Sequence, residues 1–193
     1  MSLFVNARER KMWLAACGLL VLIYATLAPA KGVVIWLRER NTLRLAVALV
    51  LVAVLVLLAR SFLRRRPGRR EFLIALLLLA TYVFLLLWME RAEERLHLVE
   101  YGLVAAFFYR ALAERQKLGR GLRVSPAVAA VLMTSVAGWI DEAIQFFVPS
   151  RTYDLRDVGF NALAGLLAVT AMTTLGWAEG SHGRGADSDP GTD

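Results

Sequence analysis

Six long apolar blocks are the feature that most limits what this chain can fold into. Blocks of about 18 or more predominantly apolar residues are typical of transmembrane helices, because a helix of that length spans the hydrocarbon core of a bilayer. The blocks cover residues 12–30, 43–63, 72–89, 96–113, 126–148 and 158–177. They predict an all-α, polytopic transmembrane bundle with about six spans.

The composition agrees with a membrane domain. Of the 193 residues, 58% are hydrophobic, which is above the roughly 45–50% of an ordinary soluble domain. No linker is long enough to separate two cores, so residues 1–179 are expected to form one transmembrane domain. Residues 180–193 are rich in Gly, Ser and Asp, with little apolar surface to bury, and they predict a disordered cytoplasmic tail.

The basic residues bracket the apolar blocks and predict an orientation. The net charge is +7, but no basic stretch is interleaved with stacking aromatics, so nucleic acid is not an expected partner and membrane lipids are. With six spans, 15 Lys and Arg fall on the side of the two termini and 8 fall on the other side. Because cytoplasmic loops carry the excess of basic residues, both termini are predicted to be cytoplasmic, in a bacterial plasma membrane.

The first apolar block has a second interpretation, as a cleaved signal peptide. Basic residues precede it, and the sequence Ala28-Pro29-Ala30 resembles a cleavage site. The apolar run is long for a signal peptide, which favours a retained first span. The single cysteine, Cys17, lies inside this block, so it can form neither an internal disulfide nor a zinc cage by itself.

Ionisable residues inside the fifth block contradict its apolar character. Asp141 and Gln145 are four residues apart and share one helix face with Gly138, while Glu142 lies about 100° further round. Counting back from the end of the block at about 1.5 Å per residue places Asp141 on the order of 10 Å below the membrane surface. Two adjacent carboxylates at that depth need a proton or a compensating cation. These residues therefore predict either a functional site or a structural polar lock, that is, polar side chains whose only role is to hold the helices together.

The fourth and sixth blocks carry the other polar groups expected at comparable depth. His97, Glu100 and Tyr101 have the spacing of one helix face, and Asn161 lies one turn after Asp157. Asp157 has an alternative role as the N-cap of the last helix, and Asn161 has one as a hydrogen-bonding contact between helices. All these residues are predicted to converge at the extracytoplasmic end.

The polar pattern resembles the VanZ-like family of bacterial membrane proteins, named after an accessory protein of teicoplanin resistance. The residues that carry the resemblance are Asp141, Glu142, Gln145, Phe147, Pro149, Arg151, Asp154, Asp157 and Asn161, with His97 and Tyr101 upstream and the segment from Tyr24 to Pro29 at the end of the first block. Ser150 and Ala164 stand where the family more often has glycine. The resemblance implies a VanZ-like domain and a polar site rather than a defined reaction.

Three functions remain open. The resemblance implies an envelope protein that influences the action of teicoplanin-type glycopeptides, with a glycopeptide or an envelope lipid intermediate as partner. The second is an intramembrane enzyme on a lipid-linked or phosphorylated envelope substrate. In that enzyme the candidate catalytic residues are His97, Asp141 and Glu142, and the anion clamp is Arg151. The third is a small proton- or cation-coupled transporter.

Across these functions, the candidate binding residues are Glu100, Tyr101, Gln145, Arg151, Asp154, Asp157 and Asn161. No ligand spacing in the sequence identifies a metal or a cofactor.

Overall fold

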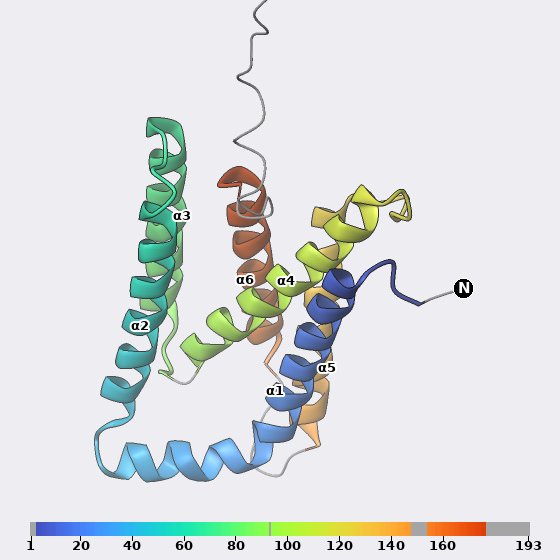
Figure 1. The fold of residues 1–193 in the computed structure, drawn as a ribbon. Coiled ribbons are helices and arrows are strands. Elements are labelled where there is room, and N and C mark those ends of the chain that lie inside the picture. The colour runs from blue at the N-terminus through green and yellow to red at the C-terminus, as the bar shows by residue number, and fades with distance from the viewer. Residues whose placement is uncertain (1–2, 93, 148–153, 177–193) are drawn as a thin grey trace, which may run out of the picture.

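The computed structural model describes residues 3–92, 94–147 and 154–176, and in this part of the chain it contains helices and loops but no strand (Figure 1). The helices are α1 (Ala7–Glu39), α2 (Leu43–Leu63), α3 (Arg69–Trp88), α4 (Glu94–Lys117), α5 (Pro126–Phe146) and α6 (Leu155–Thr174). Each of the six contains a stretch long and apolar enough to cross a membrane. The prediction of an all-α bundle with six spans is therefore confirmed. The predicted tail at 180–193 lies outside the described residues.

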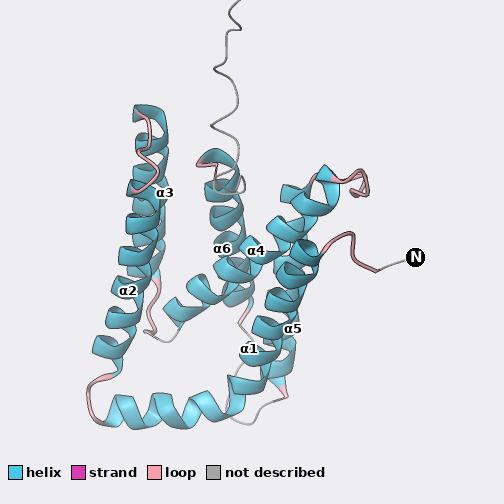
Figure 2. Cartoon of the chain, viewed as in Figure 1, coloured by secondary structure: helices cyan, strands magenta, loops and turns pink. Residues whose placement is uncertain are grey.

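Polar side chains fix where three of the helices begin; Figure 2 shows the helices and the loops that connect them. Asn6 caps α1 by accepting a hydrogen bond from the backbone N–H of Glu9 at 2.8 Å. Ser125 caps α5 immediately before Pro126, which confirms the predicted start of the fifth span. Asp154 caps α6, so the alternative that Asp157 is the cap is wrong. Asp157 lies in the first turn of α6 instead, where the positive end of the helix dipole stabilises a carboxylate.

The first helix is longer than predicted, because it continues through Pro29 to Glu39. Proline removes one backbone hydrogen bond and bends a helix, but it does not always end one. Figure 1 shows the last part of α1 turning sharply away from the first part before the chain enters α2. We call residues 30–39 the arm. Val34 and Leu37 of the arm pack against a small buried cluster at the start of α2.

The core of the bundle is formed by α4, α5 and α6, with the first part of α1 packed against α4. Within the spans of α4 and α5, 39% of the residues are buried inside the protein, whereas the figure is 6% for α2 and for α3. The fourth block is the least convincing span by sequence, yet its helix is central. The polar residues of α4 face neighbouring helices and not lipid, so the helix can cross the membrane with fewer apolar residues than a lipid-exposed span requires.

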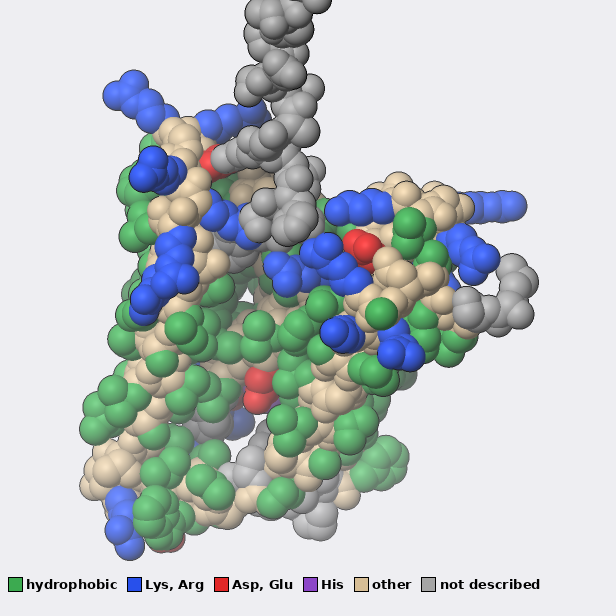
Figure 3. Space-filling view, in the orientation of Figure 1, with side chains coloured by type: hydrophobic (Ala, Val, Ile, Leu, Met, Phe, Trp, Pro, Cys, Tyr) green, Lys and Arg blue, Asp and Glu red, His purple; other side chains and the backbone are tan. Residues whose placement is uncertain are grey.

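The distribution of basic residues still predicts the orientation of the bundle. Figure 3 shows most of the visible Lys and Arg side chains gathered at the end that carries the N-terminus, the α2–α3 connection and the end of α4. Reporter fusions after residues 67, 118 and 180 are expected to report the cytoplasm, and a fusion near residue 152 is expected to report the exterior. A cytoplasmic signal at residue 152 contradicts this orientation.

A buried ion pair holds the N-terminal end of α1 against α4. The Glu9 side chain is fully buried, and its carboxylate accepts hydrogen bonds from the Val5 backbone N–H at 2.6 Å and from Trp13 Nε1 at 3.2 Å. Arg115 Nε lies 3.1 Å from the same carboxylate. The sequence alone gave no indication of this contact, because Glu9 lies among basic residues that resemble an ordinary cytoplasmic flank.

We expect Glu9→Gln to lower the free energy of unfolding by about 2–3 kcal/mol, because the variant loses a charge-assisted contact in a buried position. Thermal unfolding of the purified protein in detergent measures the change. The matched control is Glu39→Gln, since Glu39 is an exposed glutamate of the same helix. Equal unfolding temperatures for the Glu9 and Glu39 variants contradict a stabilising role for the pair.

Candidate functional site

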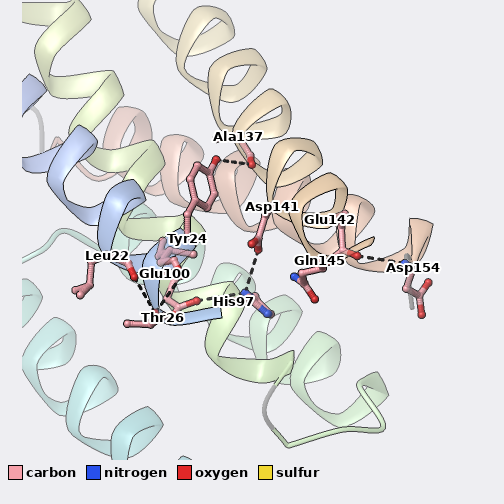
Figure 4. A network of polar contacts seen from close by, with 11 residues as sticks. Leu22, Tyr24, Thr26, His97, Glu100, Ala137, Asp141, Glu142, Gln145 and Asp154 are labelled. Atoms are coloured by element: carbon pink, nitrogen blue, oxygen red, sulfur yellow. Dashed lines mark hydrogen bonds and ion pairs between the residues drawn. The ribbon is translucent and has the colours of Figure 1, made fainter. Parts of the chain in front are cut away.

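The consecutive helices α4 and α5 bring His97 and Asp141 together. His97 Nδ1 in α4 lies 3.8 Å from Asp141 Oδ2 in α5 and 3.2 Å from Glu100 Oε2, one turn along its own helix. Figure 4 shows the Asp141 side chain pointing toward the imidazole, with the Glu100 carboxylate approaching the same ring nitrogen. Asp141 is completely buried. The predicted convergence of the histidine and the carboxylate is thus confirmed.

Helical spacing explains how each side chain reaches this point. His97 and Tyr101 are four residues apart on α4, and their ring centroids are 6.2 Å apart. Asp141 and Gln145 are likewise four apart on α5, and both are buried. The predicted faces of α4 and α5 therefore meet each other inside the bundle, rather than facing lipid.

Glu142 has a structural task that the sequence did not reveal. Its Oε2 accepts a hydrogen bond from the Asp154 backbone N–H, and its Oε1 accepts one from Gln145 Nε2, each at 3.2 Å. Asp154 in turn caps α6 through the backbone N–H of Arg156. These contacts tie the start of α6 to the end of α5. They make Glu142 and Asp154 supports of the helix junction, while Asp141 carries the contact with the histidine.

The described part of the site is acidic. Asp157 of α6 acts electrostatically on His97, together with Glu100 and Asp141. One of the terminal nitrogens of Arg95, two residues before His97 on α4, donates to the Met89 carbonyl at 3.1 Å. The predicted anion clamp, Arg151, lies outside the described residues. Among the residues described, no group of three His, Cys, Asp or Glu side chains is arranged to hold a metal ion.

The first helix also contributes to the site. The Tyr24 hydroxyl donates a hydrogen bond to the Ala137 carbonyl at 2.8 Å, one turn before Asp141 on α5. In sequence, the only signal was a tyrosine near the end of an otherwise apolar block. The contact brings a fourth helix to the cluster, and it uses a backbone carbonyl whose position no side-chain pattern identifies.

Asn161 is held in close contact with the backbone of α5. A Cβ atom added to Gly138 would lie 2.6 Å from Asn161 Cβ, a distance that real Cβ contacts essentially never show. One turn further along, a Cβ on Gly165 would lie 3.0 Å from Thr134 Cγ2. Glycines at these two positions therefore allow α5 and α6 to approach closely, as small residues do between membrane helices.

The fold and this cluster define a class: a multi-pass helical membrane protein with an ionisable cluster inside its bundle. Comparisons of the chain with models of protein families, with curated proteins and with solved structures find no match. The site residues are therefore interpreted from their own geometry.

Proposed function

We propose that this chain is a VanZ-like protein of the bacterial plasma membrane. In this proposal its polar site opens toward the extracytoplasmic side and binds an envelope molecule, and binding influences the action of teicoplanin-type glycopeptides. The observation that carries the proposal is the contact between His97 and Asp141 inside an otherwise apolar bundle. The resemblance of the surrounding motif to the VanZ-like family supplies the cellular context.

Burial of the cluster favours binding over a purely structural role. Ionisable groups within a membrane are costly, so they normally face a protein interior and serve a function there. A structural lock would be expected to pair its polar atoms completely. Neither carboxylate oxygen of Asp141 makes a hydrogen bond of ordinary geometry in the part of the chain that the structure describes, although Tyr101 and Gln145 lie close by. A ligand that supplies hydrogen-bond donors fits such a site.

The acidity of the cluster indicates which part of an envelope molecule would bind. Glu100, Asp141 and Asp157 surround one histidine, and carboxylates accept hydrogen bonds but do not attract phosphate. Hydroxyl, amide and amino groups of a lipid-linked envelope intermediate or of a glycopeptide match this surface. A phosphate would need a cation such as Arg151 in addition.

The second candidate function, an intramembrane enzyme, is favoured by the orientation of His97. Its Nδ1 faces both Asp141 and Glu100, so Nε2 is the nitrogen that can exchange a proton with a substrate. A carboxylate that orients a histidine and stabilises its charged form is a recurrent acid–base arrangement. In this case His97 is the proton-transferring residue and Asp141 positions it. Glu142 is less suited to that task, because both of its oxygens already accept hydrogen bonds.

The test of the proposed function is the susceptibility of cells to teicoplanin. In a strain that lacks the gene, we expect the wild-type protein to change teicoplanin susceptibility and His97→Gln to lose that change completely, at equal abundance in the membrane. Glu39→Gln, far from the cluster in sequence and exposed, is the control and should behave as the wild type. Unchanged susceptibility on adding the wild-type gene contradicts the proposal.

A further inference from the structure

We propose that the junction of α4, α5 and α6 beside His97 binds one monovalent cation, through oxygen atoms of Asp141, Asn161 and Tyr101. The cation is either an alkali ion such as Na⁺ or the primary ammonium group of an envelope molecule. This inference deepens the proposed function, since it names the chemical class of ligand that the same site takes.

The contacts of α6 with its neighbours place the three residues near one another. Asn161 lies against Gly138, one helical turn before Asp141 on α5. Along the same face of α6, a Cβ on Gly102 of α4 would lie 3.8 Å from Ala168 Cβ and 4.0 Å from the Ala164 carbonyl oxygen. Tyr101 packs with Ala164, one turn after Asn161, in one buried cluster. Tyr101, adjacent in sequence to Gly102, is an electrostatic neighbour of the Asp141 carboxylate. All three side chains therefore belong to the same level of the junction.

The polar atoms of these three side chains are buried and unpartnered. Asp141 and Tyr101 are 0% exposed and Asn161 is 1% exposed. No hydrogen bond of ordinary geometry joins the Tyr101 hydroxyl, either Asp141 oxygen or either side-chain amide atom of Asn161 to a residue that the structure describes. Tyr101 and Gln145 nevertheless lie close enough to Asp141 to act on its carboxylate. Each buried polar atom without a partner costs free energy, and several at one place indicate a bound polar species.

The charges and atom types indicate a cation. The unpartnered acceptors are carboxylate, amide and hydroxyl oxygens, which are the donor atoms that hard cations prefer. His97 is the one basic side chain that makes an ion contact with Asp141 within the described chain, and the Tyr24 hydroxyl is directed to the Ala137 carbonyl. An anion would be repelled by the buried Asp141 carboxylate and by Glu100 beside it.

The charge count further indicates a single positive charge. Of the three oxygen-bearing side chains, only Asp141 can carry a negative charge, whereas divalent sites normally use several carboxylates.

A route to the site passes Glu100, whose side chain is 37% exposed, and His97, whose side chain is 15% exposed. Figure 3 shows acidic atoms within the hollow between α2 and α1. A cation entering there would meet negative charge first.

The test is thermal unfolding of the purified full chain in detergent, followed by tryptophan fluorescence. The salts are NaCl, methylammonium chloride and choline chloride at equal ionic strength. Because a ligand that binds only the folded state raises the unfolding temperature, Na⁺ or methylammonium should raise it by several degrees and saturably relative to choline. A response to Na⁺ alone identifies an alkali ion, and a response to methylammonium alone identifies an ammonium group. Equal unfolding temperatures in all three salts overturn the proposal.

Two variants locate the bound cation. Asp141→Asn and Asn161→Ala should each abolish the difference between the salts, whereas Glu39→Gln should retain it. If Asp141→Asn keeps the full response, the cation is bound elsewhere and the proposal is wrong. Should either variant fail to fold, the line width of the ²³Na resonance with the wild-type protein gives an independent measure. Broadening that excess methylammonium reverses, or that saturates as the ratio of Na⁺ to protein rises, supports the site. Its absence together with equal unfolding temperatures overturns the proposal. Neither measurement uses teicoplanin, so cation binding and the envelope function can fail separately.

Discussion

Replacing Gly138 with alanine is expected to destabilise the bundle by about 2–3 kcal/mol, because the added methyl group overpacks the junction of α5 and α6. The atom that it meets, Asn161 Cβ at 2.6 Å, is attached directly to the backbone of α6. No rotation of the Asn161 side chain relieves that contact, so one helix must move. The measurement is thermal or denaturant unfolding of the purified protein in detergent.

Gly102→Ala is the matched control for this change. It makes the same substitution within a buried helix, but its Cβ meets Ala168 Cβ at 3.8 Å, an ordinary contact. Alanine also has the better helix propensity, by up to about 1 kcal/mol at either position. The control variant should therefore be as stable as the wild type or slightly more stable, and equal losses at the two glycines would exclude a specific clash at Gly138.

A second variant tests whether the clash is with Asn161. Asn161→Gly removes the Cβ atom that the new methyl group would meet. We expect the pair Gly138→Ala and Asn161→Gly to be more stable than the sum of the two single losses predicts, because the two positions are coupled. Additive losses would show that Gly138 contacts something other than Asn161.

The spans could be predicted from sequence because hydropathy depends only on composition along the chain. The end of α1 could not, since Pro29 in an apolar block is equally consistent with a helix end and with a kink. The packing of Val34 and Leu37 in the arm against the start of α2 stabilises the continued helix, and it is visible only in the fold. The cap of α6 was uncertain for a related reason: Asp154 and Asp157 are both good N-caps, and the hydrogen bond from the Asp154 backbone to Glu142 distinguishes them.

The candidate site could be predicted in part. Depth in the membrane is proportional to position along a helix, so His97 and Asp141 could be assigned to the same level before their contact was known. The direction in which a side chain points around its helix, relative to other helices, is not encoded locally. For that reason the supporting role of Glu142 and the contact of Tyr24 with the Ala137 carbonyl emerged only from the fold.

Asp141→Asn is expected to abolish the effect of the protein on teicoplanin susceptibility while changing the free energy of unfolding by less than about 1 kcal/mol. The side chain keeps its shape, and its oxygens make no hydrogen bond of ordinary geometry with a described residue that the change could remove. What disappears is the charge facing His97 at 3.8 Å, on which binding of a cationic group or orientation of the histidine depends. A neutral amide is also less costly than a carboxylate in a buried site, which offsets the lost attraction.

Glu142→Ala, in the same turn of α5, is expected to have the opposite effect: loss of stability rather than loss of function alone. Its carboxylate accepts hydrogen bonds from the Asp154 backbone N–H and from Gln145 Nε2, so removing it leaves one donor unpaired at the start of α6 and one near the end of α5. Each unpaired buried donor costs about 1–3 kcal/mol, and this variant should lose stability before it loses function. Unfolding temperature, abundance in the membrane and teicoplanin susceptibility, measured on both variants, separate the two roles. If Asp141→Asn instead loses the 3–5 kcal/mol or so that is typical of a broken buried ion pair and function follows its abundance, Asp141 stabilises the bundle and the site must be sought elsewhere.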